Sequence, residues 1–303
     1  MEPKKQLLTR IQGWLETQGY PLEFKVAAAF QAAGMATRQG FFVREVNGQS
    51  AREVDVIARI RSKTENSNVS VTFVVECKWS RDKPWVIFTD ANTKMAPSAC
   101  IAQTIGSRLG EAALHCLAAN KSLHGLESFA MRDRNGFNGR RAFSSESDQD
   151  HFYSTVQSIV SKSVAYVTEA DDGEDKIIPQ YGTIAFPLIV LDGDLFEVFF
   201  DSSQNALTIT PADFIRMHWR GASNPDIWIA TVDIVTATYL DTFVAKRKAE
   251  LEILGSRVAQ LYPKFSACLK SKSLSPLDIK PAPRGYTGLP EMLQRIDRLK
   301  KKE

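Results

Sequence analysis

The sequence predicts an α/β domain in which a central mixed β-sheet is covered by helices on its faces. Segments with apolar residues at helical spacing alternate with short runs rich in Val, Ile and Phe. Their order is helix, three strands, helix, and then further strands and helices. With 303 residues, of which 44% are hydrophobic and 24% charged, the chain can bury a sizeable core in one large domain or two ordinary ones.

The first 34 residues predict two helices. Residues 3–18 place apolar side chains along one helical stripe. This stripe consists of Leu7, Leu8, Ile11 and Leu15. Tyr20 and Pro21 interrupt the pattern and residues 22–34 resume it, with Pro21 suited to a helix start and Gly34 to a C-cap.

Three β-type runs follow the second helix. They are residues 40–46 (GFFVREV), 52–61 (REVDVIARIR) and 69–79 (VSVTFVVECKW). The turn NGQ separates the first two, which should form a hairpin. The polar loop SKTENSN separates the second and third, so these two can also pair as neighbours.

The remaining chain continues the alternation of helices and strands. Helices are expected at residues 97–120, 150–168 and 237–262, and strands at 183–193, 194–200 and 226–236. Residues 131–150 are polar and contain Gly and Ser, which predicts a loop or insertion. The Pro-rich end predicts a tail.

These patterns give a domain organisation in three parts. Residues 1–20 form an N-terminal helix, residues 21–262 form the α/β domain, and residues 263–303 form a C-terminal tail. An insertion is expected near residues 121–180. The chain therefore carries one large domain with a C-terminal helical extension.

The lack of a recognisable targeting signal and the spacing of the cysteines suggest a cytoplasmic protein. The sequence has no run of about 18 apolar residues and no apolar region of a signal peptide near its start, so we expect no association with a membrane. The four cysteines form no CxxC pair, which favours reduced thiols over a disulfide framework or a zinc site.

Charge is distributed unevenly along the chain. Residues 1–143 hold 20 Lys and Arg against 13 Asp and Glu, residues 144–243 hold 4 against 16, and residues 244–303 hold 14 against 6. Basic segments around an acidic one allow an anionic partner to be bound by one surface and rejected by another. Charges spread over solvated faces would explain the acidic segment equally well.

Two carboxylates and a lysine stand on neighbouring predicted strands. By the alternation of side chains, Asp55 shares a face with Ile57, while Val54 and Val56 take the other. Glu76 and Lys78 share one face of the next strand, so strand pairing would bring Asp55 and Glu76 together. Because two ionised carboxylates repel, this arrangement favours a divalent cation, and Mg²⁺ suits oxygen ligands.

The pattern of Asp55, twenty intervening residues and then Glu76-Cys77-Lys78 resembles the D…(D/E)xK signature of the PD-(D/E)XK nuclease superfamily. Residues 21–34 resemble the first core helix of Mrr-like restriction enzymes and Holliday-junction resolvases, with Glu23 at a metal-site position. Gln103 is similar to a glutamine of Mrr-like members. The resemblance covers residues 21–117. Val54 stands where the signature has Pro, and the loop between the acidic strands is longer than in compact members.

The resemblance implies a restriction-endonuclease-like mixed central sheet flanked by helices, with extra strands added. It also implies hydrolysis of DNA phosphodiester bonds with Mg²⁺, or Mn²⁺ in its place, in restriction, phage defence or DNA processing. Asp55 and Glu76, with Glu23 and the backbone carbonyl after Glu76, would bind the metal. Lys78 would orient or deprotonate the attacking water, and Gln103 would hold Lys78, the water or a phosphate.

Other interpretations of the same residues stay open. Glu76 and Lys78 could form a surface pair on an edge strand, and Glu23 could simply favour the helix dipole. The chain could be a catalytically silent module that binds nucleic acid or assembles with a partner. An enzyme that needs a partner subunit for target choice, or that acts as a homodimer, is also consistent. Four residues near the third strand could contact nucleic acid or pack in the core, namely Trp79, Arg81, Lys83 and Trp85.

Overall fold

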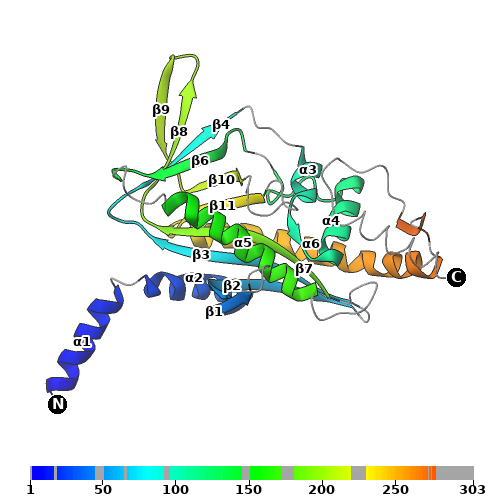
Figure 1. The fold of residues 1–303 in the computed structure, drawn as a ribbon, viewed down its shortest axis with the longest axis horizontal. Helices are drawn as coiled ribbons and strands as arrows, with labels where there is room; N and C mark the ends of the chain where they lie inside the picture. Colours follow the sequence, from blue (N-terminus) through cyan, green and yellow to red (C-terminus); the bar gives the residue numbers. More distant parts are fainter. Residues whose placement is uncertain are drawn as a thin grey trace.

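The computed structural model describes residues 2–16, 19–44, 51–64, 67–91, 96–130, 132–144, 151–171, 181–219, 230–271, 273 and 275–277. These residues form a large mixed β-sheet with helices on both of its faces (Figure 1). The predicted α/β class is confirmed.

The helices are α1 (Glu2–Glu16), α2 (Tyr20–Ala32), α3 (Pro97–Ala102), α4 (Arg108–Asn120), α5 (His151–Asp171) and α6 (Leu240–Ser271), followed by the 3-10 helix η1 (Ser275–Leu277). The strands are β1 (Ala36–Arg44), β2 (Ala51–Lys63), β3 (Asn68–Trp79), β4 (Trp85–Asp90), β5 (Ile105–Gly106), β6 (Asn135–Arg141), β7 (Tyr181–Asp192), β8 (Leu195–Asp201), β9 (Ala206–Pro211), β10 (Phe214–Trp219) and β11 (Ala230–Thr236). Helix α1 extends away from the sheet, and its apolar side chains Leu7, Leu8 and Trp14 are exposed (Figure 1).

The sheet has the strand order β1-β2-β3-β7-β11-β10-β6-β4-β8-β9, and the short β5 pairs with β7 outside this path. Strands β1, β2 and β3 are antiparallel neighbours, which confirms the predicted hairpin of β1 with β2 and shows that β2 also pairs with β3. Strand β3 runs parallel to β7 along its whole length, from Asn68↔Tyr181 to Trp79↔Asp192. Because β3 is paired with β2 from Asn68 to Val75 and with β7 from Asn68 to Trp79, its residues are held in a fixed register.

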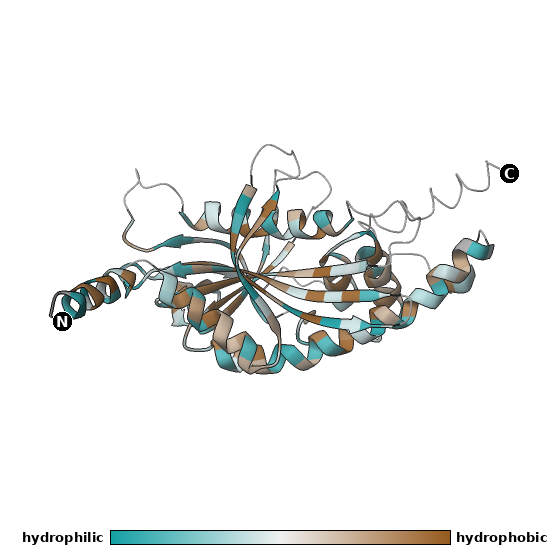
Figure 2. Cartoon of the chain, turned by 90° about the horizontal axis from the view of Figure 1, so that it is seen from below, coloured by the Kyte–Doolittle hydropathy of each residue, from teal (hydrophilic) through white to brown (hydrophobic). Residues whose placement is uncertain are grey.

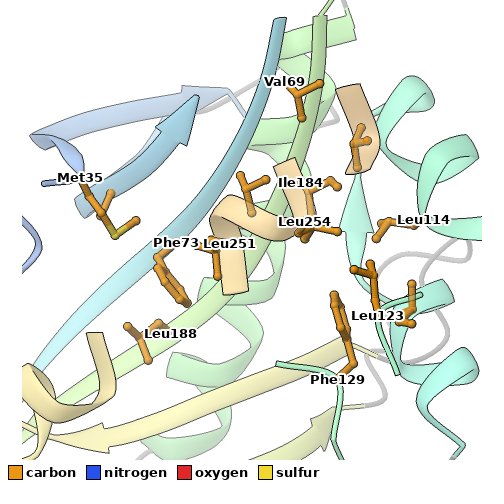
Figure 3. Close-up of a cluster of buried hydrophobic side chains, with 14 of the residues drawn as sticks. Met35, Val69, Phe73, Leu114, Leu123, Phe129, Ile184, Leu188, Leu251 and Leu254 are labelled. Atoms are coloured by element: carbon orange, nitrogen blue, oxygen red, sulfur yellow. The ribbon is translucent and has the colours of Figure 1, made fainter. Parts of the chain in front are cut away.

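Each face of the sheet carries its own hydrophobic core. One core joins the sheet to α2, α4 and α6, and includes Phe73, Leu188 and Leu254 (Figure 3). The other joins the sheet to α5 and includes Val74, Phe152 and Ile189. Figure 2 shows helices on both sides of the strands, with apolar residues along the strands between them. Residues Val74 and Phe73 alternate between the two cores, as neighbours on a strand must.

Helix α4 lies very close to strand β7 at Gly110. A Cβ atom at Gly110 would lie 2.5 Å from the backbone oxygen of Thr183. Ser107 caps α4 at this contact, because its hydroxyl accepts hydrogen bonds from Gly110 N at 3.4 Å and from Thr183 N at 2.9 Å. The absence of a side chain at Gly110 therefore sets the distance between helix and sheet.

Several predicted segments differ from the structure. The single helix expected at residues 97–120 is two helices, because Ser107 starts a new helix after β5. The prediction of a loop at residues 131–150 is wrong over Asn135–Arg141, which form strand β6 and pair with β4 and β10. Strands β4, β9 and β10 lay in segments where no strand was predicted. The two strands predicted around residue 193 exist as β7 and β8, but they pair with other strands and not with each other.

The C-terminal helix continues past the predicted end at residue 262. Helix α6 runs through Pro263 to Ser271, although proline removes one helical hydrogen bond. Phe265 and Cys268 beyond the proline are fully buried in the core around α2, α4 and α6, which explains why the helix continues. The predicted tail from residue 278 onward lies outside the described residues.

Over the parts of the chain that the structure describes, no helix combines the length and apolar character needed to cross a membrane. All four cysteines are free thiols.

The contact at Gly110 gives a test of the fold. We expect Gly110→Ala to lower the free energy of unfolding by about 1–3 kcal/mol, because the added Cβ would collide with a backbone atom that has nowhere to move. Urea unfolding measures this effect. Gly125→Ala is the matched control, since a Cβ there meets nothing within 4 Å. Equal stability of the two variants would contradict the close contact between α4 and β7.

Candidate active site

The predicted site residues lie where strands β2 and β3 separate. Backbone pairing between these strands ends at Val56↔Val75, whereas β2 stays paired with β1 and β3 stays paired with β7. Just beyond this point the carboxylate of Asp55 accepts a hydrogen bond from the backbone N–H of Cys77, with a distance of 2.7 Å between Oδ2 and N. A side chain of β2 therefore holds the backbone of β3 directly between Glu76 and Lys78.

The carboxylate of Glu76 is buried between two lysines. Its Oε1 atom accepts a hydrogen bond from Nζ of Lys78 at 2.6 Å, and its Oε2 atom accepts one from Nζ of Lys162 at 2.5 Å. Glu76 is only 5% exposed and the side chain of Lys162 only 8%. Because Lys162 belongs to α5, this pair joins the central strand to the helix that covers it. The structure thus excludes the simple surface pair of Glu76 and Lys78.

The lysines determine the ionisation of Glu76. Burial acts to raise the pKa of Glu76, but the ammonium groups of Lys78 and Lys162 outweigh burial and lower the pKa below its usual value. For Lys78, burial acts to lower the pKa, and the carboxylate of Glu76 outweighs it and raises the pKa. The pair therefore stays ionised at neutral pH.

Two further carboxylates of the site have raised pKa values. Burial raises the pKa of Asp55 to about 6, and the neighbouring charge of Glu76 adds to the shift. Helix α2 brings Glu23 into the same electrostatic environment, where burial raises its pKa to about 7, with Asp55 and Glu53 adding to the shift. Ionisation of Asp55 and Glu23 is therefore unfavourable unless a further cation is bound near them.

The donor set fits a divalent cation in part. Asp55, Glu76 and Glu23 offer hard carboxylate oxygens within one charged neighbourhood, as Mg²⁺ prefers. Among the described residues, however, no group of three or more His, Cys, Asp or Glu side chains is close enough to hold a metal ion. Both oxygens of Glu76 are bonded to ammonium groups. A metal ion at Glu76 would therefore share the carboxylate oxygens with the two lysines or displace one of them.

Gln103 lies apart from the contacts just described. It is the C-cap of α3, and its buried Oε1 atom has no hydrogen-bond partner among the described residues. Ile105, two residues later, pairs with Ala185 of β7, whereas Glu76 pairs with Ile189. Four residues along a strand span about 13 Å. The hydrogen bonds and ion pairs found for Glu76 and Lys78 do not include Gln103, so its proposed role stays a prediction.

Strict alternation fails next to Asp55. Val54 packs in the core beneath α5 together with Ile57, whereas Val56 packs in the opposite core. The prediction that Val54 and Val56 share one face is therefore wrong. The irregularity falls at Asp55, where β2 has lost its backbone pairing with β3 and where the register with β1 passes over Asp55 and Gly40.

Two tryptophans near the site differ in their surroundings. Trp85 is 1% exposed and packs edge to face on Phe152, so it is a core residue. Trp79 is 46% exposed and can contact a ligand.

Lys162 was missed by the sequence analysis. The visible signal was a lysine between Val160 and Val164, which belong to the apolar side of this helix. Nothing in the sequence indicates its partner, because Glu76 lies 86 positions earlier in the chain.

Comparison of the chain with models of protein families, with curated proteins and with solved structures finds no match.

Removing one lysine of the buried pair tests its contribution to stability. We expect Lys162→Met to lower the free energy of unfolding at pH 7 by about 2–4 kcal/mol, because Glu76 would keep a buried charge with one partner fewer. Lys264→Met, at an exposed position of α6, is the control and should change stability by less than about 0.5 kcal/mol.

The pH dependence of this loss identifies its cause. The lowered pKa of Glu76 stabilises the fold above the ordinary pKa of 4.5, and this contribution disappears as pH falls through the folded-state pKa. The difference between wild type and Lys162→Met should therefore shrink in acid. A difference that is constant with pH would show that lost packing, and not lost charge, destabilises the variant.

Asp55 should behave in the opposite way. Its pKa is raised from 3.8 to about 6, so its ionisation costs stability progressively as pH rises through this range. We expect Asp55→Asn to increase the free energy of unfolding at pH 8 by about 1–2 kcal/mol, and the gain to vanish below about pH 4. Urea unfolding across pH, with exposed Asp133→Asn as control, measures it. If Asp55→Asn is less stable than the wild type at pH 8, the claim that the charge of Asp55 destabilises the fold is refuted.

Proposed function

We propose that the protein is a Mg²⁺-dependent nuclease that hydrolyses phosphodiester bonds of DNA. The observation that carries this proposal is the hydrogen bond from Cys77 N to Asp55, because it holds Asp55 beside the strand segment that presents Glu76 and Lys78. Two acids and a lysine in this arrangement can bind a metal ion and position a water molecule next to a phosphate.

The order of elements supports a restriction-endonuclease-like fold. Helix α2, the antiparallel strands β1 to β3 and helix α4 occur in the order expected for the region that carries the resemblance. Glu23 stands in the first turn of α2, where burial and the charges of Asp55 and Glu76 raise its pKa to about 7, which supports a position near these carboxylates.

Each residue has a distinct role in the proposed reaction. Asp55 and Glu76, with Glu23 beside them, would hold Mg²⁺, which when bound polarises a phosphoryl oxygen and lowers the pKa of water. Lys78 would orient the attacking water and stabilise the negative charge that gathers on the phosphate in the transition state. Lys162 would keep Glu76 ionised and fix the direction of its carboxylate from α5.

One observation favours the second candidate, a catalytically silent module that binds nucleic acid or assembles with a partner. Lys78 and Lys162 together satisfy both oxygens of Glu76, so the site is neutralised at this residue without a metal. A partner subunit for target choice, homodimer formation and a cytoplasmic location stay predictions.

A cleavage assay tests the nuclease directly. Plasmid and linear DNA are incubated with the protein and Mg²⁺ or Mn²⁺, beside Asp55→Ala and Lys78→Ala. We expect each variant to lose at least about a hundredfold in rate, because each removes a group that stabilises the transition state. Lys63→Ala, an exposed lysine at the far end of β2, should retain the rate of the wild type.

The outcomes separate the two candidates. Cleavage that persists unchanged in Asp55→Ala and Lys78→Ala would refute the site assignment. Calorimetry that detects DNA binding without Mg²⁺ binding, together with no cleavage by the wild type, would establish the silent module instead.

A further inference from the structure

A cavity of about 420 Å³ opens beside the candidate site, on the side of the sheet that α5 covers. Its wall is formed by the start of β2, the end of β3, the start of β4, the end of β6 and the first two turns of α5. Lys78 and Glu76 belong to both the candidate site and this wall. We call this cavity the α5 pocket.

The wall of the α5 pocket is predominantly basic. Arg52, Lys78 and Arg141 contribute three cations from three different strands. Glu76 is the carboxylate in the wall; it pairs with Lys78 and with Lys162 of α5, and Arg141 pairs with the exposed Asp82 at 3.5 Å, so the cations still outnumber the carboxylates. The electrostatic balance therefore favours an anion in the pocket.

The start of α5 adds polar groups suited to a phosphate. His151, Ser154 and Ser158 line the pocket from the first turns of this 21-residue helix. A helix N-terminus attracts anions through its free N–H groups and its dipole. Serine hydroxyls can donate further hydrogen bonds to phosphate oxygens.

An independent observation indicates a missing hydrogen-bond acceptor. Trp85 is one of the lining residues and is 1% exposed, and its buried indole Nε1 has no hydrogen-bond partner among the described residues. The Nε atom of Arg141 in the same wall is likewise buried without a partner. A buried donor without an acceptor is costly, so such donors commonly face a ligand or an ordered water.

The size and the rim of the pocket indicate what carries the phosphate. A volume of about 420 Å³ lies within the range of small-molecule sites and is sufficient for a single nucleotide. Trp79 lies at the pocket with its ring half-exposed, where a base can stack on it. Basic side chains, hydroxyls and an exposed indole form the combination that recognises a nucleotide.

We propose that the α5 pocket binds one nucleotide, with its phosphate between Arg52, Arg141 and the start of α5 and its base against Trp79. This inference rests on the proposed function in that the nucleotide belongs to the strand next to the bond that is cut. The ligand chemistry is a nucleoside with a 5′-phosphate, which a free mononucleotide or the end of a DNA strand can supply.

Calorimetry without metal tests the pocket. Deoxyadenosine 5′-monophosphate is titrated into the protein in EDTA, beside deoxyadenosine, and a short 5′-phosphorylated oligonucleotide is compared with its 5′-hydroxyl form. We expect the wild type to bind the mononucleotide and not the nucleoside, because the phosphate supplies most of the contacts. Tighter binding of the phosphorylated oligonucleotide than of the mononucleotide would identify the end of a DNA strand as the source of the ligand. Tighter binding of the mononucleotide would identify a free nucleotide as the source.

The chain offers a matched pair of variants. Arg141→Ala removes a cation from the pocket wall and should weaken binding of the mononucleotide at least about tenfold. Arg140→Ala removes the same charge from the adjacent exposed position of β6, which does not line the pocket, and should change binding less than about twofold. Arg141→Lys, which keeps the charge, should restore part of the affinity, and thermal unfolding checks that Arg141→Ala is folded.

The outcomes distinguish this inference from the nuclease proposal. The proposed cleavage requires Mg²⁺ and Asp55, whereas mononucleotide binding is measured in EDTA and requires Arg141. Binding that depends on Arg141 in a protein that never cleaves DNA would support the pocket and refute the nuclease. Absence of mononucleotide binding by the wild type, or equal effects of Arg140→Ala and Arg141→Ala, would overturn the pocket proposal.

Discussion

The buried carboxylate of Glu76 is the constraint on which this part of the structure depends. Removing a carboxylate from water costs several kcal/mol, and the cost is offset only where charged partners hold it in good geometry. Lys78 supplies one partner from the same strand and Lys162 supplies the other from α5. The position of α5 over the sheet is therefore fixed by an ionic contact as well as by the apolar core beneath it.

Two further carboxyl groups near the contact of Glu76 with its lysines lower the stability of the fold when they are ionised. Asp55 and Glu23 lie in the field of Glu76, and burial together with negative neighbours raises the pKa of both. Titratable groups that a fold holds in unfavourable surroundings often mark functional sites. The basic wall of the α5 pocket lies beside these carboxylates. Groups of opposite charge therefore stand close together at this site without being fully paired with one another.

The sequence was sufficient for those features that depend on local pattern. The Val-rich runs and their turns predicted β1, β2 and β3, and pairing of β2 with β3 follows from a short polar loop between them. Features that depend on distant contacts were not predictable. Lys162 finds Glu76 only through the packing of α5, and the strand of residues 135–141 reads as a polar loop because two of its seven residues are glycine. Helix α6 passes Pro263 because buried contacts beyond it outweigh a local signal to stop.

The separation of β2 and β3 has a mechanical meaning. Where two strands are paired, the backbone ladder keeps them about 4.8 Å apart and leaves side chains little influence on this spacing. Beyond Val56 and Val75 that control ends, and the fork is spanned by the Asp55 carboxylate. The width of the fork is therefore encoded in side chains, so a single substitution can tune the geometry of the site while the rest of the sheet stays intact.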